Sequence, residues 1–464
     1  ETYVPAYCED TDLAFRVRAA GKRVLYQPKS VVVHHEGISH GTDESRGLKA
    51  YQSINQNKFR ERWREVLDAQ HFERYWDVLR SHDRPASREM ILIVDHYIPQ
   101  PDRDAGSRTM WCVMRVLVKM GLIVKFWPQN QAYDPDYADW LQQAGIEVIV
   151  GEEVRNNFSG WLTANGDRLK YVFLSRPTVA PEFLPLLRKR TKARILYYGH
   201  DLHHARLQME HELLGSQATR GEAEKMRKVE ESLWREVDVV YYPSHVETEA
   251  VRARVPGVQA HTLPIFFFED PPCVNGPEGR KDLLFVAGFG HPPNVDAAKW
   301  LVQAILPLVR SRMNAAVHLW LVGSNPTDDV RQLAGDGVSV TGYVSDEALL
   351  HMYAHARVAV VPLRVGAGMK GKVIEALQYG VPLVTTPVGA QGLEGLESIA
   401  TVSGDEQLLA ERICDLLRDD GAWKEASRRQ QEYVQGRFSV EAMEHALRRG
   451  MADATTGGQV CRPS

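Results

Sequence analysis

Short apolar runs that alternate with longer amphipathic stretches constrain the fold of this chain more than any other feature of its sequence. The first series of runs occupies residues 90–94, 122–126, 146–150, 171–174, 194–198 and 239–242. A second series repeats the plan at residues 282–286, 317–322, 338–340, 358–361 and 382–385. Such runs are typical of strands buried on both faces, and their alternation with helices indicates parallel sheets. The sequence therefore predicts an α/β fold with two successive doubly wound lobes.

The two series also set the expected domain boundaries. We expect a Rossmann-like N-terminal lobe over residues 89–264, a Rossmann-like C-terminal lobe over 265–436, and a returning helix and tail over 437–464. Residues 1–82 form a separate first block, joined by a polar linker at residues 83–88. Because doubly wound sheets bind ligands outside the carboxyl ends of their strands, we expect the two lobes to face each other across a ligand-binding cleft.

Charge and cysteine usage narrow the possible partners. Lys and Arg number 56 against 60 for Asp and Glu, which favours neither nucleic acid nor a charged membrane surface. No apolar run approaches the roughly 20 residues that span a bilayer. The five cysteines lack metal-ligand spacing and are expected to be thiols in a reducing cytoplasm. The chain begins at Glu1 directly in dense, motif-like sequence, so we expect a larger N-terminal part to precede it.

The strongest local signal is a strand, a glycine-rich turn, a helix and a further strand between residues 362 and 382. Gly368 allows the backbone to approach a ligand, and the start of the helix offers N–H groups to a phosphate. Lys370 and Lys372 add positive charge where a diphosphate would bind, and Glu375 could accept hydrogen bonds from two ribose hydroxyls. The alternative is an ordinary strand–helix corner with solvated side chains. Taken alone, the segment favours neither.

This segment and three others resemble glycosyltransferase family four, whose members are retaining enzymes of GT-B architecture. The resemblance rests on GKVIEALQYGVPLVTT (371–386), FVAGFGHPPNVD (285–296), LVGS (321–324) and VTGYV (340–344). It covers roughly residues 89–450 and implies two Rossmann-like lobes that face a cleft.

The resemblance also assigns roles to residues of the C-terminal lobe. It implies backbone contacts to the donor phosphates near Gly288 and Phe289, with Asn294 in the same donor-binding loop, and nucleobase contacts near Gly342 and Tyr343. It further implies that the last helix, residues 440–451, packs back on the N-terminal lobe.

Two departures from the family pattern bear on activity. Many members have a sugar-contacting glutamate eight positions before the ribose-binding glutamate, and here that position is Ala367. Many also have an arginine and a lysine after the first strand of the C-terminal lobe, where this chain reads GHPPN. Lys370 and Lys372 are the residues expected to supply that charge instead. These departures leave the identity of the sugar, and to a lesser degree activity itself, open.

The N-terminal lobe has two segments that match the family's cleft. Asp104, Gly106 and Ser107 end a polar loop after the first strand, where the family has a glycine-rich loop near the donor phosphate and acceptor; a plain surface loop is the alternative. The segment YGHDLH resembles the family's His-Asp segment, whose histidine lies beside the transferred sugar. Either His200 or His203 is expected to fill that role, because the segment lies at the carboxyl end of a strand. The alternative is a capping aspartate between exposed histidines.

The segment YCEDTDLAFRVRAAGKRVLYQP (7–28) of the first block resembles the end of glycosyltransferase family two, whose members are inverting enzymes of GT-A architecture. Glu9 and Asp10 match its acidic motif, whose aspartate is the general base for the acceptor hydroxyl. His34 matches its terminal motif, where a histidine can bind the metal on the diphosphate. The alternatives are an acid-rich helix start and a strand-end histidine. The strands that bind the nucleotide in this family, and the Asp-x-Asp metal motif that belongs with them, are absent from the first block, so we expect an inactive remnant, with Mg²⁺ or Mn²⁺ only in a complete GT-A domain.

Local patterns predict the secondary structure of this block. Residues 23–34 read as a strand, and residues 44–79 read as one long amphipathic helix. Phe59, Trp63 and Val66 form the apolar stripe of that helix, which should pack on the first block or on the next lobe.

The sequence as a whole predicts a hexosyltransferase-like, retaining GT-B glycosyltransferase that moves a sugar from a nucleotide-sugar donor to a glycan or lipid-linked glycan acceptor. The resemblance suggests bacterial surface polysaccharide, such as O-antigen or capsule, and a bifunctional enzyme of which this is the second transferase. We expect no cofactor for the GT-B part, because helix N-termini and lysines can stabilise the departing diphosphate. We expect a cytoplasmic location, and the acceptor class allows peripheral contact with the inner membrane.

Two other functions remain open at this point. One is an inactive GT-B lobe that binds glycans or acts as a scaffold, as Ala367 and the missing basic pair suggest. The other is a nicotinamide-dependent oxidoreductase, since doubly wound folds serve both activities. Against the second, Gly-x-Gly-x-x-Gly opens neither lobe.

Overall fold

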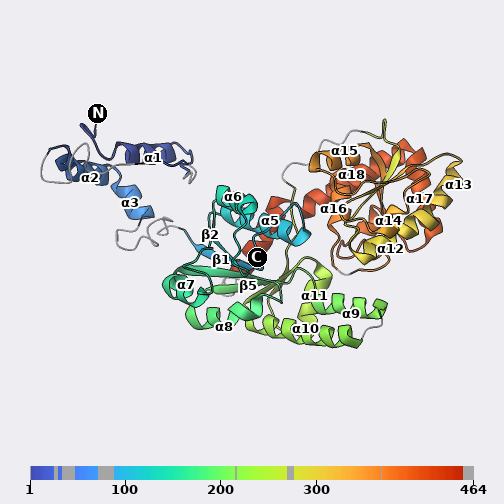
Figure 1. The fold of residues 1–464 in the computed structure, drawn as a ribbon, viewed down its shortest axis with the longest axis horizontal. Coiled ribbons are helices and arrows are strands. Elements are labelled where there is room, and N and C mark those ends of the chain that lie inside the picture. The colour runs from blue at the N-terminus through green and yellow to red at the C-terminus, as the bar shows by residue number, and fades with distance from the viewer. Residues whose placement is uncertain are drawn as a thin grey trace, which may run out of the picture. The chain divides into compact units, whose positions relative to one another are not determined.

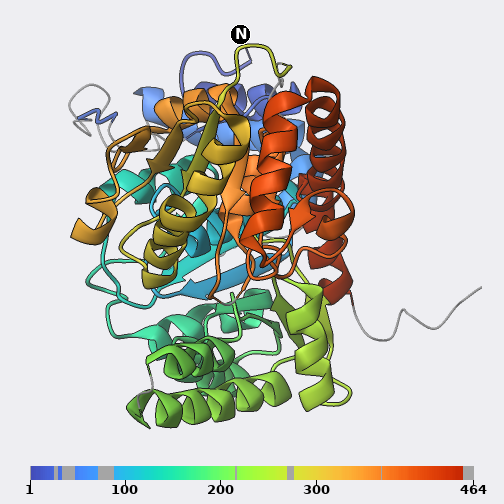
Figure 2. The same cartoon turned by 90° about the vertical axis from the view of Figure 1, so that its right-hand side faces the viewer.

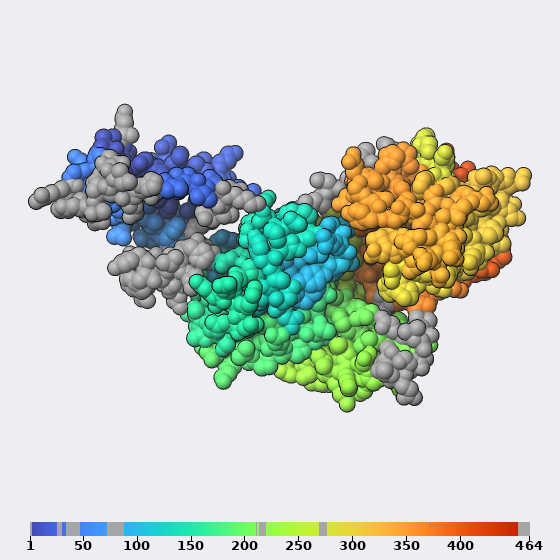
Figure 3. Space-filling model, viewed as in Figure 1, coloured from blue at the N-terminus to red at the C-terminus, as the bar shows by residue number. Residues whose placement is uncertain are grey.

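The computed structural model describes residues 2–25, 30–33, 47–71, 88–214, 217–268, 276–366 and 368–452. The chain divides into two compact units, Glu1–Glu89 and Met90–Ser464 (Figure 1). The second unit contains two lobes, each built on one parallel sheet. In the space-filling view, residues coloured cyan to light green form one continuous surface and residues coloured yellow to orange form another (Figure 3). No helix in the described ranges is long and apolar enough to cross a membrane.

The N-terminal lobe has a seven-stranded parallel sheet in the order β3-β2-β1-β4-β5-β6-β7. The strands are β1 (Met90–Asp95), β2 (Ile123–Pro128), β3 (Ile146–Val148), β4 (Leu169–Ser175), β5 (Arg194–Tyr198), β6 (Val239–Tyr242) and β7 (Ala260–Thr262). The helices are α5 (Ala105–Lys119), α6 (Pro135–Gln143), α7 (Phe158–Asn165), η3 (Gly166–Arg168), α8 (Ala180–Arg190), α9 (His203–Leu214), α10 (Gln217–Glu236) and α11 (His245–Arg254). The strand order reverses between β1 and β4, which is where doubly wound sheets bind ligands.

Side-chain alternation explains why this sheet is covered on both faces. Ile91 and Ile93 of β1 belong to one apolar cluster, whereas Leu92 and Val94 belong to the other, because successive strand residues point to opposite faces. The first cluster includes residues of α5 and α6, and the second includes residues of α7, α8 and α11. All four side chains are fully buried, and each such burial stabilises the fold by roughly 1.5–3 kcal/mol.

The C-terminal lobe repeats the arrangement with a six-stranded parallel sheet in the order β10-β9-β8-β11-β12-β13. The strands are β8 (Asp282–Val286), β9 (Leu319–Val322), β10 (Val338–Val340), β11 (Ala356–Val361), β12 (Leu383–Thr385) and β13 (Thr401–Val402). The helices are α12 (Pro292–Trp300), η4 (Leu301–Ile305), α13 (Leu306–Met313), α14 (Asp328–Arg331), α15 (Asp346–His355), α16 (Gly371–Gln378), η5 (Leu396–Ser398), α17 (Glu406–Arg418), α18 (Asp420–Arg437) and α19 (Val440–Met451). Here the order reverses between β8 and β11.

Single residues determine local features of two helices. Helices α12 and α13 are joined by the π-helical turn η4, which ends at Ile305, two residues before Pro307, a residue without an N–H to continue α-helical bonding. Helix α5 begins at Ala105, because the Asp104 side chain accepts a hydrogen bond from the Ser107 N–H at 2.7 Å and caps the first turn.

The last helix of the described chain returns to the N-terminal lobe, as predicted (Figure 2, dark red). Helix α18 packs on α16 and α17, and α19 packs on α5, β5 and β7. The hydroxyl of Tyr241 donates to the carbonyl of Leu447 at 3.1 Å, and Arg194 Nε donates to the carbonyl of Gly450 at 2.9 Å. These contacts confirm the predicted packing of residues 440–451.

The first unit contains α1 (Glu9–Ala19), η1 (Gly47–Lys49), α2 (Ala50–Arg62) and α3 (Arg64–Gln70). The prediction of one unbroken helix is wrong, because the backbone leaves helical geometry at Trp63, whose indole N–H donates to Asp12 at 2.7 Å. The rings of Phe59 and Trp63 pack on Phe15 of α1, with centroids 5.0 and 5.3 Å away. Phe59 and Trp63 of the predicted stripe therefore pack on the first block.

The strand predicted at residues 23–34 does not form in its described parts. Residues 23–25 and 30–33 have no strand partner, and the side chains of Val31, Val32 and Val33 are exposed. A strand requires a neighbour to pair its backbone groups, and the described part of this unit supplies none.

Candidate active site

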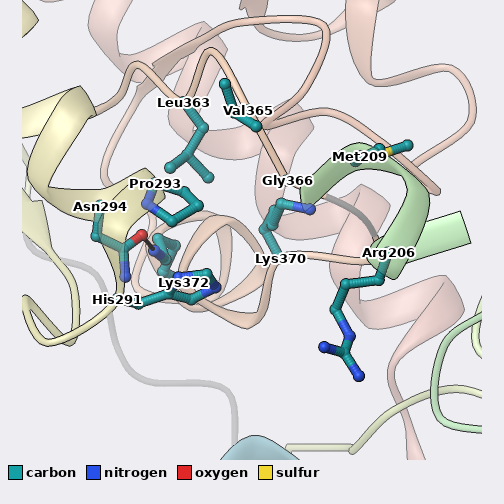
Figure 4. A pocket seen from close by; sticks show the side chains of 10 residues that line it. All are labelled: Arg206, Met209, His291, Pro293, Asn294, Leu363, Val365, Gly366, Lys370 and Lys372. Atoms are coloured by element: carbon teal, nitrogen blue, oxygen red, sulfur yellow. Dashed lines mark hydrogen bonds between the residues drawn. The ribbon is translucent and has the colours of Figure 1, made fainter. Parts of the chain in front are cut away.

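A pocket of about 130 Å³ lies where the C-terminal sheet reverses its strand order (Figure 4). The loop after β8 and the start of α12 supply His291, Pro293 and Asn294. The segment between β11 and the first turn of α16 supplies Leu363, Val365, Gly366, Lys370 and Lys372. Helix α9 of the N-terminal lobe completes the lining with Arg206 and Met209. The pocket thus receives side chains from both lobes at a point where such sheets bind ligands.

The two lysines of the pocket are held in surroundings that disfavour their charge. Burial, together with the like charge of Lys370, lowers the pKa of Lys372 to about 7, although Glu375 opposes the shift. Burial also lowers the pKa of Lys370 to about 8, opposed by Glu247 and Asp201. An anion bound beside these amino groups would restore their protonated form. The pair therefore favours a ligand with several negative charges.

Hydrogen bonds connect three of the predicted donor-binding residues. Lys372 Nζ donates to Asn294 Oδ1 at 2.5 Å (Figure 4). Asn294 Nδ2 donates to the carbonyl of Gly288 at 2.7 Å. Lys370 Nζ donates to the carbonyl of Gly368. The structure therefore brings the glycine loop after β8 and the lysine turn after β11 into one network.

Phe289 contributes to the core of the lobe. Its ring is fully buried 5.8 Å from that of Phe285, and its N–H donates to the carbonyl of Ser324 at 2.8 Å. A phosphate contact from this N–H would require that bond to open. Beside it, Gly323 allows close approach of two loops, because an added Cβ would lie 1.9 Å from the carbonyl oxygen of Ala287.

Gly342 and Tyr343 follow β10 at the same edge of the sheet. Gly342 has a φ of +73°, and its carbonyl accepts a hydrogen bond from the N–H of Gly323 at 3.1 Å. The side chain of Tyr343 is 70% exposed. An exposed aromatic ring at this edge is suited to stacking on a planar group such as a nucleobase.

Glu375 lies in α16 and forms an ion pair with a residue of the other lobe. Its Oε1 accepts a hydrogen bond from Arg108 Nη1 of α5, and the side chains are 21% and 30% exposed respectively. Arg108 was not predicted as a site residue. Its place 267 residues away in the sequence explains why no local motif revealed it.

His200 is held in a polar cluster at the carboxyl ends of β1, β4 and β5. Its Nε2 lies 2.7 Å from Ser175 Oγ, and its backbone has a φ of +65°. Buried Asp95 accepts a hydrogen bond from Arg176 Nε at 2.8 Å. Burial and the positive charge of Arg176 lower the pKa of His200 well below its usual value, so the ring is neutral at pH 7. Asp95, Ser175 and Arg176 were not predicted, although each lies at the carboxyl end of a buried strand.

The pKa of His203 is shifted in the opposite direction. Although burial lowers its pKa, the hydrogen bond and charge of Asp201 outweigh burial and raise it, with Nδ1 2.6 Å from Asp201 Oδ1. The same carboxylate accepts from Arg206 Nε at 3.1 Å. An added Cβ at Gly368 would lie 3.5 Å from the Cβ of Asp201, so this segment lies directly against the lysine turn. Arg206 and Met209 were missed because their helix carries no glycine or motif signal.

Asp104, Gly106 and Ser107 do not form the predicted loop. Gly106 and Ser107 lie in the first turn of α5, and Asp104 caps it, with Ser107 Oγ donating to Asp104 Oδ2 at 2.6 Å. An added Cβ at Gly106 would lie 2.6 Å from Arg176 Nη2, so the helix start contacts the cluster around His200.

In the first unit, Glu9 and Asp10 are exposed in the first turn of α1. The carboxylate that is buried there is Asp12, which accepts a hydrogen bond from Tyr3 Oη at 3.1 Å. His34 and Ala367 lie outside the described residues. Within the part of the chain that the structure describes, no group of three or more His, Cys, Asp or Glu side chains is arranged to hold a metal ion.

Comparison with known proteins supports the architecture. Residues 280–419 match the model of the family described as glycosyl transferases group 1. An uncharacterized 44.6 kDa protein in the cps region of Klebsiella pneumoniae is 23% identical over 167 residues, which are 34% of this chain and 42% of that protein. The chain therefore matches less than half the length of this relative.

Two solved structures share the fold. The sucrose-phosphate synthase of Thermosynechococcus elongatus is 19% identical, with a TM-score of 0.56 over 78% of this chain and 98% of its own. The HepE protein of Anabaena, solved in complex with UDP and glucose, is 16% identical, with a TM-score of 0.54 over 78% and 99%. The unit Met90–Ser464 thus has the GT-B fold of glycosyltransferases, with two Rossmann-like lobes, and its C-terminal lobe matches glycosyl transferases group 1.

Proposed function

We propose that the unit Met90–Ser464 is a retaining glycosyltransferase that moves a hexose from a nucleoside-diphosphate sugar to a glycan acceptor. The observation that carries the proposal is the pocket at the switch point of the C-terminal sheet. There, Lys370 and Lys372 have lowered pKa values, and Arg206 of the N-terminal lobe lines the same pocket. A diphosphate would supply the negative charge that these side chains lack.

The residues around the pocket divide naturally among the parts of such a donor. The diphosphate lies against Lys370 and Lys372, the ribose hydroxyls bind Glu375, and the base stacks on exposed Tyr343. The helix start of α16 adds backbone N–H groups beside the phosphates. This division is supported by the match of residues 280–419 to glycosyl transferases group 1.

The chemistry follows from the charges. When the bond between the anomeric carbon and the diphosphate oxygen breaks, negative charge grows on the diphosphate and positive charge on the sugar ring. The lysines stabilise the first of these charges. His200, which is neutral and anchored through Nε2 to Ser175, can hydrogen-bond a sugar hydroxyl through its other ring nitrogen without adding positive charge next to the ring.

The acceptor is proposed from the chain's relatives. The match to a protein in the cps region of Klebsiella pneumoniae supports a role in bacterial surface polysaccharide synthesis. On this proposal the acceptor is a glycan or lipid-linked glycan, and the protein works in the cytoplasm or at the cytoplasmic face of the membrane. The first unit is proposed to be the end of a preceding family-two transferase.

A binding screen followed by turnover tests the proposal. Thermal shift with UDP, GDP, dTDP and CMP should identify one nucleotide, and the protein should slowly hydrolyse the corresponding sugar nucleotides. Lys372→Met should weaken binding about tenfold or more, because a hydrogen bond to a charged group contributes roughly 1.5–3 kcal/mol. Lys299→Met is the matched control, since Lys299 pairs with Asp329 away from the pocket.

The outcomes separate the proposal from its alternative. Binding of none of the four nucleotides would overturn it. Nucleotide binding without hydrolysis or transfer to any glycan would favour the inactive, glycan-binding lobe, for which Ala367 is the sequence argument.

A further inference from the structure

The ion pair between Arg108 and Glu375 connects the N-terminal lobe to the residue proposed to bind ribose. Arg108 lies in the first turn of α5, and Glu375 lies in the second turn of α16. The guanidinium reaches Oε1 of the carboxylate through Nη1. With 21% of its side chain exposed, Glu375 remains accessible to a ligand.

Two aromatic rings hold the guanidinium in place. The Cζ of Arg108 lies 4.3 Å from the ring centroid of Phe266 and 5.7 Å from that of Phe268. Phe266 is buried, and an added Cβ on Gly371 would lie 3.4 Å from its ring, so Phe266 also packs on the start of α16. A guanidinium held by cation–π contacts and one ion pair has little freedom to reorient.

The number of acceptor sites on a carboxylate decides whether Glu375 can bind Arg108 and a ligand at the same time. A carboxylate has about four acceptor sites, and binding of two ribose hydroxyls uses two of them. The bond to Arg108 occupies one site on Oε1. The buried Tyr353 hydroxyl lies beside the same carboxylate, and the acceptor sites that neither group uses are open to the ligand. Arg108 therefore fixes the rotation of the carboxylate and leaves sites open to two hydroxyls.

We propose that Arg108 is a positioning residue that orients Glu375 for the ribose hydroxyls, so that selection of ribose over 2′-deoxyribose depends on a residue of the opposite lobe. This inference rests on the proposed nucleotide-sugar function. It assigns the specificity of one part of the donor site to α5, in the N-terminal lobe, although the carboxylate itself belongs to the C-terminal lobe.

The test measures discrimination as well as affinity. Calorimetry on the full chain gives dissociation constants for the tightest binder among UDP, GDP and ADP, and for its 2′-deoxy counterpart. The unchanged protein should prefer the ribonucleotide about tenfold or more, the worth of one hydrogen bond to a charged group. Arg108→Met, which keeps the apolar stem, should reduce this preference to below about threefold while the affinity for the deoxynucleotide changes little.

Two further variants complete the experiment. Arg108→Lys keeps the charge without the planar fork and should restore part of the preference. Arg115→Met is the matched control on the same helix, where Arg115 lies over Trp111 at 5.6 Å, and it should retain the full preference.

Four results would overturn the inference. Equal weakening of both nucleotides in Arg108→Met would indicate a structural or phosphate-binding role, and tighter ribonucleotide binding would show that Arg108 competes with ribose. An unchanged preference, or a protein that binds only dTDP, would remove Arg108 from ribose selection. If none of the nucleotides tested binds the unchanged protein, the proposed function itself fails.

Discussion

The lowered pKa values of the two pocket lysines predict a pH dependence of nucleotide binding with a definite sign. In the ligand-free pocket, burial and mutual repulsion keep the pKa of Lys372 at about 7 and burial keeps that of Lys370 at about 8. A bound diphosphate favours the protonated form of both. Binding above pH 7 therefore takes up protons, and affinity must fall as pH rises through these values.

The magnitude follows from the fraction of lysine that must be protonated on binding. Between pH 7 and pH 8.5, a group of pKa 7 weakens binding by about fifteenfold, since each pKa unit corresponds to 1.36 kcal/mol. A group of pKa 8 adds about fourfold over the same range. The dissociation constant of the best nucleoside diphosphate should therefore rise by about tenfold to sixtyfold.

Calorimetry in buffers of different ionisation enthalpy measures both the affinity and the protons taken up. Lys372→Met should weaken binding at pH 7 by about tenfold and leave only the shallower dependence of Lys370. Lys299→Met should reproduce the full profile. A dissociation constant that stays within about twofold between pH 7 and pH 8.5 in the unchanged protein would refute the reasoning, because the lysines would then not sense the ligand.

Three further predictions concern stability, metal and the first unit. Gly323→Ala should lower the free energy of unfolding by about 2–4 kcal/mol in urea denaturation, because its Cβ would lie 1.9 Å from the carbonyl oxygen of Ala287. Gly335→Ala is the control, because Gly335 has a similar φ but open space around it, so that only backbone strain is added. This control should lose less unfolding free energy than Gly323→Ala, and equal losses would contradict the steric argument. Nucleotide binding should persist in EDTA. If EDTA abolishes binding and Mn²⁺ or Mg²⁺ restores it, a metal ion and not the lysines neutralises the diphosphate. Deletion of residues 1–85 should leave nucleotide affinity unchanged in calorimetry, and its loss from a protein that remains folded would place the first unit in the site.

Most strands could be predicted from apolar runs in the sequence, including β3 and β10 at the edges of their sheets. The run at residues 90–94 has an apolar side chain at every position because β1 is covered on both faces. By contrast, β7 and β13 were missed. Each lies at an edge of its sheet, each has at most three residues, and pairing with a neighbouring strand, not an apolar run, defines it.

The residues of the candidate site also differ in whether a local sequence pattern could reveal them. Lys370, Lys372 and Glu375 lie close together in the sequence, so a glycine-rich turn was enough to suggest them. Arg108 and Arg206 reach the same region from helices of the other lobe. Their places depend on how the two lobes pack, and no short-range pattern in the sequence carries that information.

On the proposed function, the distribution of charge suggests how the site would select its donor. Lys370 and Lys372 of the C-terminal lobe would bind the phosphates and Glu375 the ribose, whereas Ala367 occupies the position where the family resemblance implies a sugar-contacting glutamate. An alanine offers no hydrogen bond, so the C-terminal lobe has less means to distinguish sugars that differ only in a hydroxyl. Groups able to make that distinction belong to the N-terminal lobe, where Asp201 Oδ1 lies 2.6 Å from His203 Nδ1 beside the lysine turn. On the proposed function, the phosphates and the ribose are bound from the C-terminal lobe, with Arg108 of the N-terminal lobe orienting Glu375, and the sugar is chosen by the N-terminal lobe.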